Sequence, residues 1–403
     1  MSRGRRAGYR DAMSRLLTLL GSAFLAAATF ASGVPPVGSE AKPVAPLPKP
    51  VDELFTGTLA GLPAVAVLRV EADGVRSGTY FYRRRGRDIA LVSGGKKGLL
   101  LECAAEHAEV SDEPCAAPSG VWSVTLSGDR LEGTWRVSER AETGKPISFV
   151  RAPIGPGDKA FARYEATRRA LLSFADVSRH EQSGIAWRIV KEKLSGVTGP
   201  LLVSGPRPDV VARVNADLEA KLRDDAASRL APGEYEVRHT VELANTRTFS
   251  VSTSTGWDSP GAAHPSNGFN AVTWDLTTGE KVEWSRVVRL VDARAPRLDL
   301  ARKDLLAAIA IRRIVAGPGG DEEGGCLGAS LESYGCSETT CEATSLYPGA
   351  PSGVDTWVLF PTEAGLAVVP GSYSEAERGC RGERIVVPWS EVRPALTVDR
   401  QVP

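Results

Sequence analysis

Residues 62–82, LPAVAVLRVEADGVRSGTYFY, decide the expected fold of the first half of the chain. Two apolar runs, 62–70 and 78–82, flank Asp73-Gly74, a dipeptide that suits a tight turn between antiparallel strands because its residues tolerate positive φ. Both runs are short and rich in β-branched or aromatic side chains, as strands are. The stretch therefore predicts a β-hairpin.

The same pattern continues across residues 51–151, where short apolar runs alternate with glycine-containing turns. Gly128-Asp129 marks a second tight turn, and 128–137, GDRLEGTWRV, repeats the turn and the Gly-Thr-aromatic step of 73–82. Seven or eight short strands in a row predict an antiparallel meander. We expect it to close into a small barrel, because closure removes exposed strand edges. The expected strands after 78–82 are 89–92, 99–103, 122–126, 133–137 and 147–150.

The start of the chain has the features of a signal peptide. Five arginines precede or enter the apolar run 16–28, which is too short to span a bilayer and is followed by small residues up to Gly33. We expect residues 1–33 to be removed and the protein to be periplasmic or secreted, with no membrane span after cleavage. Residues 34–50 contain six prolines and predict an extended, semi-rigid linker.

Composition and charge place the chain among ordinary globular proteins. Charged residues make up 24% and apolar residues 42%, and the formal net charge is zero. Without residues 1–33 the chain keeps 44 basic and 48 acidic residues. This balance gives no electrostatic footprint for nucleic acid, so we expect no nucleic-acid partner. At 403 residues the chain is long enough for two or more domains.

The second half predicts an α+β domain over residues 181–403, with antiparallel sheet packed against helices. A connector helix is expected within 152–180, a second helix over 209–230 with Asp209 as its N-cap, and a third over about 298–315. Expected strands come in groups and do not alternate regularly with helices, which favours α+β over α/β. These strands are 185–191, 234–254, 269–276, 280–284, 355–361, 365–369 and 384–387.

The six cysteines are an even number in an exported chain, which favours disulfides. Cys103 and Cys115 lie twelve residues apart around a polar loop and are expected to pair. The other four allow three connectivities, of which we favour Cys336 with Cys341 and Cys326 with Cys380. The alternative is a zinc site, but the sequence has no CxxC and no histidine near these cysteines. We therefore expect no metal and no cofactor.

Two stretches resemble one known family. Residues 261–288, GAAHPSNGFNAVTWDLTTGEKVEWSRVV, and residues 357–396, ending in the strand before Pro388-Trp389-Ser390-Glu391, resemble the RsiV-like extracytoplasmic domain of unknown function. That domain occurs in lysozyme-sensing anti-sigma factors and beside the catalytic module of a peptidoglycan deacetylase. Residues 185–255 are similar to the companion domain that often precedes it, and 51–151 look like a β domain of uncharacterised envelope proteins.

The resemblance implies a binding module of the cell envelope. The transmembrane helix and sigma-binding segment of the anti-sigma factors, and the deacetylase module, have no counterpart in this sequence, so neither activity is carried over. Lysozyme or peptidoglycan is the partner that the resemblance implies. The rival interpretations are a hydrolase of cell-wall glycan and a carrier that holds a small apolar ligand inside the N-terminal barrel.

Residues 257–270 form the candidate binding segment, because their Gly, Pro, Ser and Asn content predicts a loop on a strand framework. Trp257 is hard to explain as a core residue, and exposed aromatic rings often anchor partners. We expect binding by loops that carry Trp257, Asp258, His264 and Asn267, together with Tyr373 near the C-terminus.

Competing chemical interpretations of single residues are weaker. His264 in a turn can equally fix the local backbone, and Asp275 and Glu280 flank a tight turn that itself selects such residues. The acidic loop 317–325 lacks the ligand spacing of an EF-hand, and His180 and His239 belong to no hydrolase motif. We expect no catalytic residue.

Overall fold

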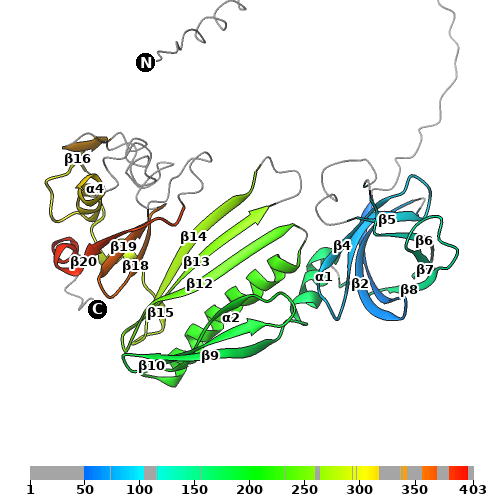
Figure 1. Cartoon of the computed structure of the whole chain (residues 1–403), viewed down its shortest axis with the longest axis horizontal. Helices are drawn as coiled ribbons and strands as arrows, with labels where there is room; N and C mark the ends of the chain where they lie inside the picture. Colours follow the sequence, from blue (N-terminus) through cyan, green and yellow to red (C-terminus); the bar gives the residue numbers. More distant parts are fainter. Residues whose placement is uncertain are drawn as a thin grey trace, which may run out of the picture. The chain divides into compact units, whose positions relative to one another are not determined.

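The computed structural model describes residues 50–397, except 73, 104–114, 116, 156, 232, 259–263, 293, 296, 317–335, 337–338, 343–355 and 370–380. The expected signal peptide, all but the last residue of the Pro-rich linker, and the acidic loop 317–325 lie outside the described residues. The described residues have the predicted α+β class: a closed antiparallel barrel comes first, and antiparallel sheets with helices follow (Figure 1).

Eight strands form the closed barrel, in sequence order around the ring. The barrel closes where β1 pairs with β8, with Phe55 opposite Arg151 and Leu59 opposite Ile147. The sequence had predicted seven or eight strands here, and β1 is the one that it did not single out. The strands are β1 (Val51–Leu59), β2 (Leu62–Glu71), β3 (Gly74–Tyr82), β4 (Asp88–Ser93), β5 (Leu99–Cys103), β6 (Gly120–Ser127), β7 (Arg130–Arg136) and β8 (Lys145–Arg151).

Alternate residues of these strands point into and out of the barrel, as the pleat requires. Large rings occupy the interior: Trp122 is fully buried, with its ring centroid 5.0 Å from that of Tyr80 and 5.8 Å from that of Phe149. A barrel of eight strands is just wide enough for side chains to fill it. The buried carboxylate of Glu102 lies among these rings, and its Oε1 accepts hydrogen bonds from Tyr80 Oη (2.5 Å) and Trp122 Nε1 (2.8 Å).

The two glycines of the repeated Gly-Thr-aromatic step lie where a neighbouring strand comes close. A Cβ at Gly78 would lie 2.3 Å from the carbonyl oxygen of Val67, and a Cβ at Gly133 would lie 2.0 Å from that of Ser123. No side chain fits at such distances. The repeat therefore marks two places where the coiled sheet of the barrel needs a residue without Cβ.

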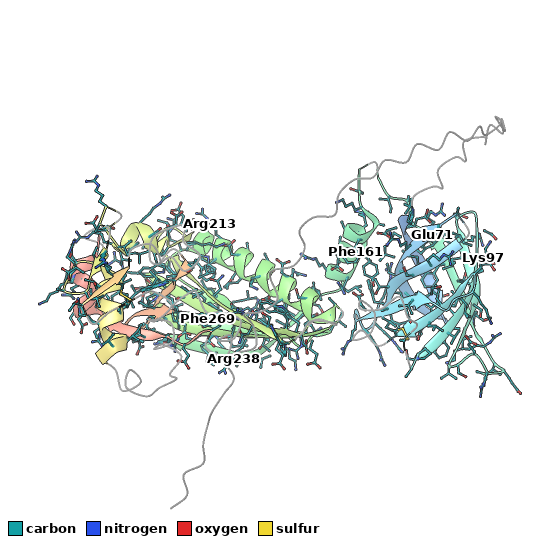
Figure 2. The ribbon with its side chains drawn as sticks, turned by 90° about the horizontal axis from the view of Figure 1, so that it is seen from above. Glu71, Lys97, Phe161, Arg213, Arg238 and Phe269 are labelled. Carbon is teal, nitrogen blue, oxygen red and sulfur yellow. A yellow bond between two sulfur atoms is a disulfide. The ribbon has the colours of Figure 1, made fainter. Side chains whose placement is uncertain are left out.

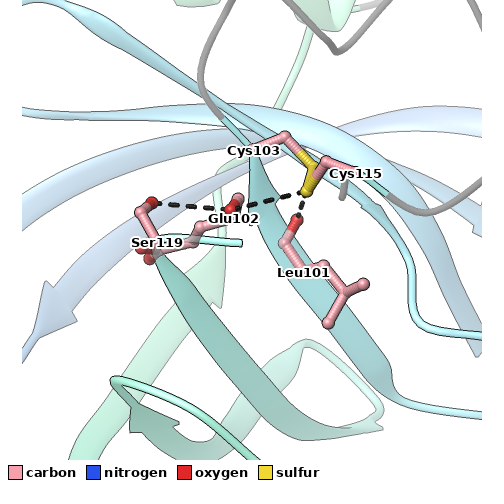
Figure 3. The surroundings of a disulfide bond; sticks show 5 residues. All are labelled: Leu101, Glu102, Cys103, Cys115 and Ser119. Atoms are coloured by element: carbon pink, nitrogen blue, oxygen red, sulfur yellow. Dashed lines mark hydrogen bonds between the residues drawn. A yellow bond between two sulfur atoms is a disulfide. The ribbon is translucent and has the colours of Figure 1, made fainter. Parts of the chain in front are cut away.

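One disulfide closes the end of β5. Cys103 and Cys115 are bonded, with Cα atoms 5.8 Å apart, beside Glu102 and Ser119 (Figure 3). The backbone N–H of Ser119 donates to the carbonyl oxygen of Glu102 at 2.8 Å, so the returning chain is also tied to β5 by a hydrogen bond. The predicted pairing of these two cysteines is confirmed.

Helix α1 (Ala160–Arg169) packs on the outside of the barrel, against β1 and β2. Tyr164 and Ala160 of α1 are buried against Leu54, Val65, Val67 and Phe81, while Phe161 stays 53% exposed (Figure 2). Asp88 at the start of β4 accepts hydrogen bonds from Tyr164 Oη (2.5 Å) and Arg168 Nη1 (2.7 Å). The connector helix is therefore fixed to the barrel by a buried ion pair as well as by apolar contacts.

A long helix and two antiparallel sheets form the next part of the chain. β9 (Phe174–Gln182), β10 (Ile185–Glu192) and β11 (Thr198–Ser204) make one sheet, and β12 (Glu234–Asn245), β13 (Thr248–Asp258), β14 (Ser266–Asp275) and β15 (Glu280–Lys281) make the other. Helix α2 (Pro208–Leu230) buries Val210, Val214, Leu218, Leu222 and Leu230 against both.

Several sequence predictions for this part change in detail. The run 234–254 is two strands joined by a turn at Thr246-Arg247, and residues 174–182 are strand β9. Arg207 is the residue before the first turn of α2, so the prediction that Asp209 is the N-cap was wrong. Pro208 occupies the first helical turn instead, where its missing N–H has no helical partner to lose.

The C-terminal part has its own core. β18 (Val358–Pro361), β19 (Gly365–Val369) and β20 (Ile385–Pro388) form a sheet. Leu359, Leu366 and Val387 on one face pack with α4 (Leu306–Ala316), and Phe360 and Val369 on the other face pack near Phe269 of β14 (Figure 2). The remaining elements are α3 (Trp284–Val287), β16 (Arg297–Asp299), β17 (Thr340–Glu342), α7 (Trp389–Val392) and the 3-10 helix η4 (Arg393–Ala395).

The helix predicted over 298–315 was wrong in its first half. Residues 297–299 form β16, in which Leu298 pairs with Cys341 of β17, and the helix begins only at Leu306. Cys341 is disulfide-bonded to Cys336, as predicted, while Cys326 and Cys380 lie outside the described residues. Over the described ranges, none of the helices has the length and apolar character needed to cross a bilayer.

Candidate functional site

The predicted binding segment lies at the end of the β13–β14 hairpin. Trp257 pairs with Tyr235 of β12 on one side and with Ser266 of β14 on the other, so its backbone is held within the sheet. Asp258 is the last residue of β13, and His264 comes just before β14. Tyr373, the fifth predicted residue, lies outside the described residues.

The side chains at this hairpin end do not converge on one point. The register places Trp257 on the face of the sheet that carries α2, and Asp258 and Asn267 on the opposite face. His264 is half-buried, and its Nδ1 lies 3.4 Å from the carbonyl oxygen of Pro265. The structure therefore brings the four described residues of the predicted set to one end of one hairpin, but divides Trp257 from Asp258 and Asn267 between its two faces.

Trp257 is the exposed member of the set. Its surface is 39% exposed, and its six-membered ring lies over Gly268, where a Cβ would be 3.4 Å from Cζ3 of the indole. Beside this ring, Arg381 Nη1 donates to the backbone carbonyl oxygen of Asn267 at 2.8 Å and to Ser266 Oγ at 3.3 Å. The hairpin end thus offers a flat aromatic surface whose position is set by paired backbone and by ring contact.

A second site lies beneath α2 and was missed from the sequence. A cavity of about 140 Å³ opens between α2 and strands β12–β15. Apolar side chains form most of its wall, and a few polar side chains line the floor and the mouth. The lining residues are Pro200, Asp217, Leu218, Lys221, Leu222, His239, Val251, Thr253, Asn270, Ala271, Val272, Trp274 and Lys281.

Three of the residues in and beside this cavity form a polar chain. Thr253 Oγ1 lies 3.0 Å from Nδ1 of His239, its cross-strand partner, and Nε2 of His239 lies 3.1 Å from Oδ2 of Asp225 on α2. The His239–Asp225 contact is close enough for an ion pair, but its two atoms are not aligned as a hydrogen bond. The side chains of His239 and Asp225 are 3% and 2% exposed, so these two members of the polar chain are buried.

Asp225 is also held by two other donors. Lys221 Nζ lies 2.5 Å and Tyr235 Oη 2.8 Å from its Oδ1. Burial would raise the pKa of the Asp225 carboxyl, but the contacts from His239, Lys221 and Tyr235 together keep it below its ordinary value. An ionised Asp225 favours the His239 tautomer with its proton on Nε2. We therefore assign Nδ1 as the acceptor of the Thr253 hydroxyl proton.

This arrangement has the order of an acid–base–hydroxyl relay, but it fits binding better than hydrolysis. Thr253 lies in the middle of β13 and pairs with His239 on one side and Asn270 on the other. The backbone N–H groups around it are therefore committed to the sheet. A hydrolase needs such donors free and aimed at the developing oxyanion.

The sequence holds only part of the signal for this cavity. Asp225 interrupts the apolar stripe of α2 that runs through Leu218 and Leu222, which marks it as a buried charge. Val237, His239 and Val241 occupy every second position along β12, so they share one face of the strand. The two valines mark this face as the inward-facing one. Only the strand register joins these residues to Thr253, and that register cannot be read from local pattern.

No family model matches this chain, and no curated protein matches it. A crystal structure of a DUF3298 family protein from Pseudomonas aeruginosa PAO1 is similar to part of this chain. The structural alignment covers 56% of this chain and 94% of the Pseudomonas chain. The sequence identity is 11% and the TM-score is 0.32. A likeness of this size carries no argument about function, and the resemblance to the RsiV-like domain stays a prediction.

Proposed function

We propose that this protein is an exported binding protein of the cell envelope that captures lysozyme or peptidoglycan through the end of the β13–β14 hairpin. Two disulfides, Cys103–Cys115 and Cys336–Cys341, support an oxidising compartment. The periplasm or the extracellular space is the location that we propose. Catalysis is not part of the proposal.

The observation that carries the proposal is the exposed indole of Trp257. An aromatic ring that is held in place before binding loses little conformational freedom when it meets a partner. Tryptophan is also among the residues that most often dominate binding energy at interfaces. Backbone pairing to Tyr235 and Ser266 and contact with Gly268 hold Trp257 in this way.

The test is a binding titration of the mature protein with lysozyme and, separately, with soluble peptidoglycan fragments. We expect Trp257→Ala and His264→Ala each to weaken capture by about 1–2 kcal/mol, roughly 5- to 30-fold in Kd. Neither variant is expected to lower the melting temperature much. The control is Val177→Ala on β9, because Val177 is 60% exposed and lies outside the hairpin.

Two outcomes would reject the proposal. Normal binding by both variants together with melting several degrees lower would mean that the hairpin end serves only packing. A loss of binding in Val177→Ala equal to that in Trp257→Ala would mean that the effect is not specific to the hairpin.

A further inference from the structure

We propose that the cavity between α2 and strands β12–β15 binds a small organic acid, with the apolar body inside and the carboxylate at the mouth. This site is separate from the hairpin end, and the proposal does not depend on partner capture by Trp257. It rests on the size of the cavity, on the chemistry of its wall, and on the donors around its mouth.

The size and the wall set the body of the ligand. A buried apolar cavity of about 150 Å³ accepts benzene, and this cavity measures about 140 Å³. Leu218 and Leu222 line it from α2, and Val251, Val272 and Trp274 line it from the sheet. A body of about six carbon atoms therefore fits.

The mouth supplies the donors for an anion. Lys221 and Lys281 lie there with side chains 46% and 57% exposed, and each contacts one carboxylate: Asp225 at 2.5 Å and Asp217 at 3.1 Å. An ammonium group carries three N–H donors, so each lysine keeps donors beyond this contact.

The two carboxylates do not depend on the lysines alone. Tyr235 Oη donates to Asp225, and Trp274 Nε1 donates to Asp217 at 3.2 Å. Each lysine can therefore turn toward a ligand without leaving its aspartate unpaired, and this matters most for Asp225, whose side chain is 2% exposed. The Oδ1 of Asn270 accepts from the backbone N–H of Ala271 at 2.8 Å, which leaves its amide N–H groups as further donors.

The floor fixes the orientation of the ligand. The hydroxyl of Thr253 and Nδ1 of His239 are paired with each other at 3.0 Å, and Nε2 of His239 faces Asp225. A carboxylate placed at the floor would lose its hydration and meet no ammonium group. The charged head therefore stays at the mouth, and the apolar body enters first.

The experiment uses benzoate as the probe and benzyl alcohol as its neutral counterpart, each titrated into the full mature chain by NMR of the backbone amides. We expect saturable shifts in α2 and in β12–β14 with benzoate, and binding of benzyl alcohol at least 10-fold weaker. Lys281→Met should weaken benzoate binding severalfold and leave benzyl alcohol unchanged. Lys193→Met is the control, because Lys193 is exposed and does not line the cavity.

Leu222→Phe fills the cavity and should abolish binding of both probes; Lys281→Met keeps the test valid if that variant does not fold. Equal affinity for benzoate and benzyl alcohol would overturn the assignment to acids. Absence of shifts at millimolar benzoate, or unchanged benzoate binding in Lys281→Met, would also overturn it. Partner capture through Trp257 should survive in Lys281→Met, so failure here is distinguishable from failure of the proposed function.

Discussion

Replacing Arg168 by methionine should destabilise the barrel strongly. The side chain of Arg168 is 2% exposed and that of Asp88 3%, and Arg168 Nη1 lies 2.7 Å from Asp88 Oδ2. Removing one partner of a buried ion pair costs about 3–5 kcal/mol, because the other charge stays buried without compensation. Tyr164 Oη remains as a donor to Asp88, so we expect the lower end, about 3 kcal/mol.

The loss should depend on pH in a defined direction. Burial raises the pKa of the Asp88 carboxyl above its ordinary value, and the Arg168 guanidinium opposes that rise. Without Arg168 the pKa of Asp88 in the folded variant should rise still further above the value in the unfolded chain. As pH falls, the folded variant then takes up a proton at a higher pH than the folded wild type, and this uptake restores part of its stability. The deficit in unfolding free energy should therefore be largest near pH 7.5 and smaller near pH 4.5.

The measurement is urea denaturation of the wild type and the variants at both pH values, followed by tryptophan fluorescence. Arg169→Met is the matched control: Arg169 is the next residue, is 48% exposed, and pairs with Asp224 at the surface, so we expect a loss of at most about 1 kcal/mol. Asp88→Asn in the Arg168→Met background should recover most of the loss. A loss below about 1 kcal/mol at pH 7.5, or an equal loss at both pH values, would refute the reasoning.

Two further outcomes are expected. Joint replacement of Cys103 and Cys115 by serine frees a loop closed over 12 residues and should lower the unfolding free energy by about 3 kcal/mol, measured by urea denaturation; an unchanged midpoint would contradict this. Protein recovered from the envelope fraction should begin between Ala31 and Val34 on N-terminal sequencing, and an intact Met1 or Met13 there would show that no cleavage occurs.

The barrel was readable from the sequence because its strands alternate in a simple period. The run 99–103 is β5 as observed, and 62–70 differs from β2 by one residue. β1 was not singled out because Asp52, Glu53 and Gly57 interrupt its apolar residues. Its assignment depends on pairing with β8 at the far end of the domain, which local pattern does not contain.

The secondary structure of the second half was harder to predict, because distant strand pairing decides more of its segments. β9 has seven consecutive exposed residues and no apolar alternation, so only its pairing with β10 makes it a strand. Residues 297–299 pair with β17 more than 40 positions away, which overrides the helical pattern that continues into α4. Non-local pairing decided both segments.

The candidate residues show where pattern stops being informative. The composition of 257–270 predicted a loop, and this prediction was wrong for both ends of the segment: Trp257 and Asp258 belong to β13, and residues 266–270 belong to β14. The division of Trp257 and Asn267 between opposite faces depends on register. So does the contact of His239 with Thr253, which lie 14 positions apart in the chain but directly opposite in the sheet.

The attachment of α1 to the barrel bears on how this chain can be divided or recombined. A gene fragment that ended at Arg151 would encode a barrel whose Val65 and Phe81 lose their cover and whose Asp88 loses its cation. A fragment that ended at Ala170 would carry its own cover with it. Genetic exchange, or the design of a chimera, should therefore preserve the junction after the helix in preference to the one after the last strand of the barrel.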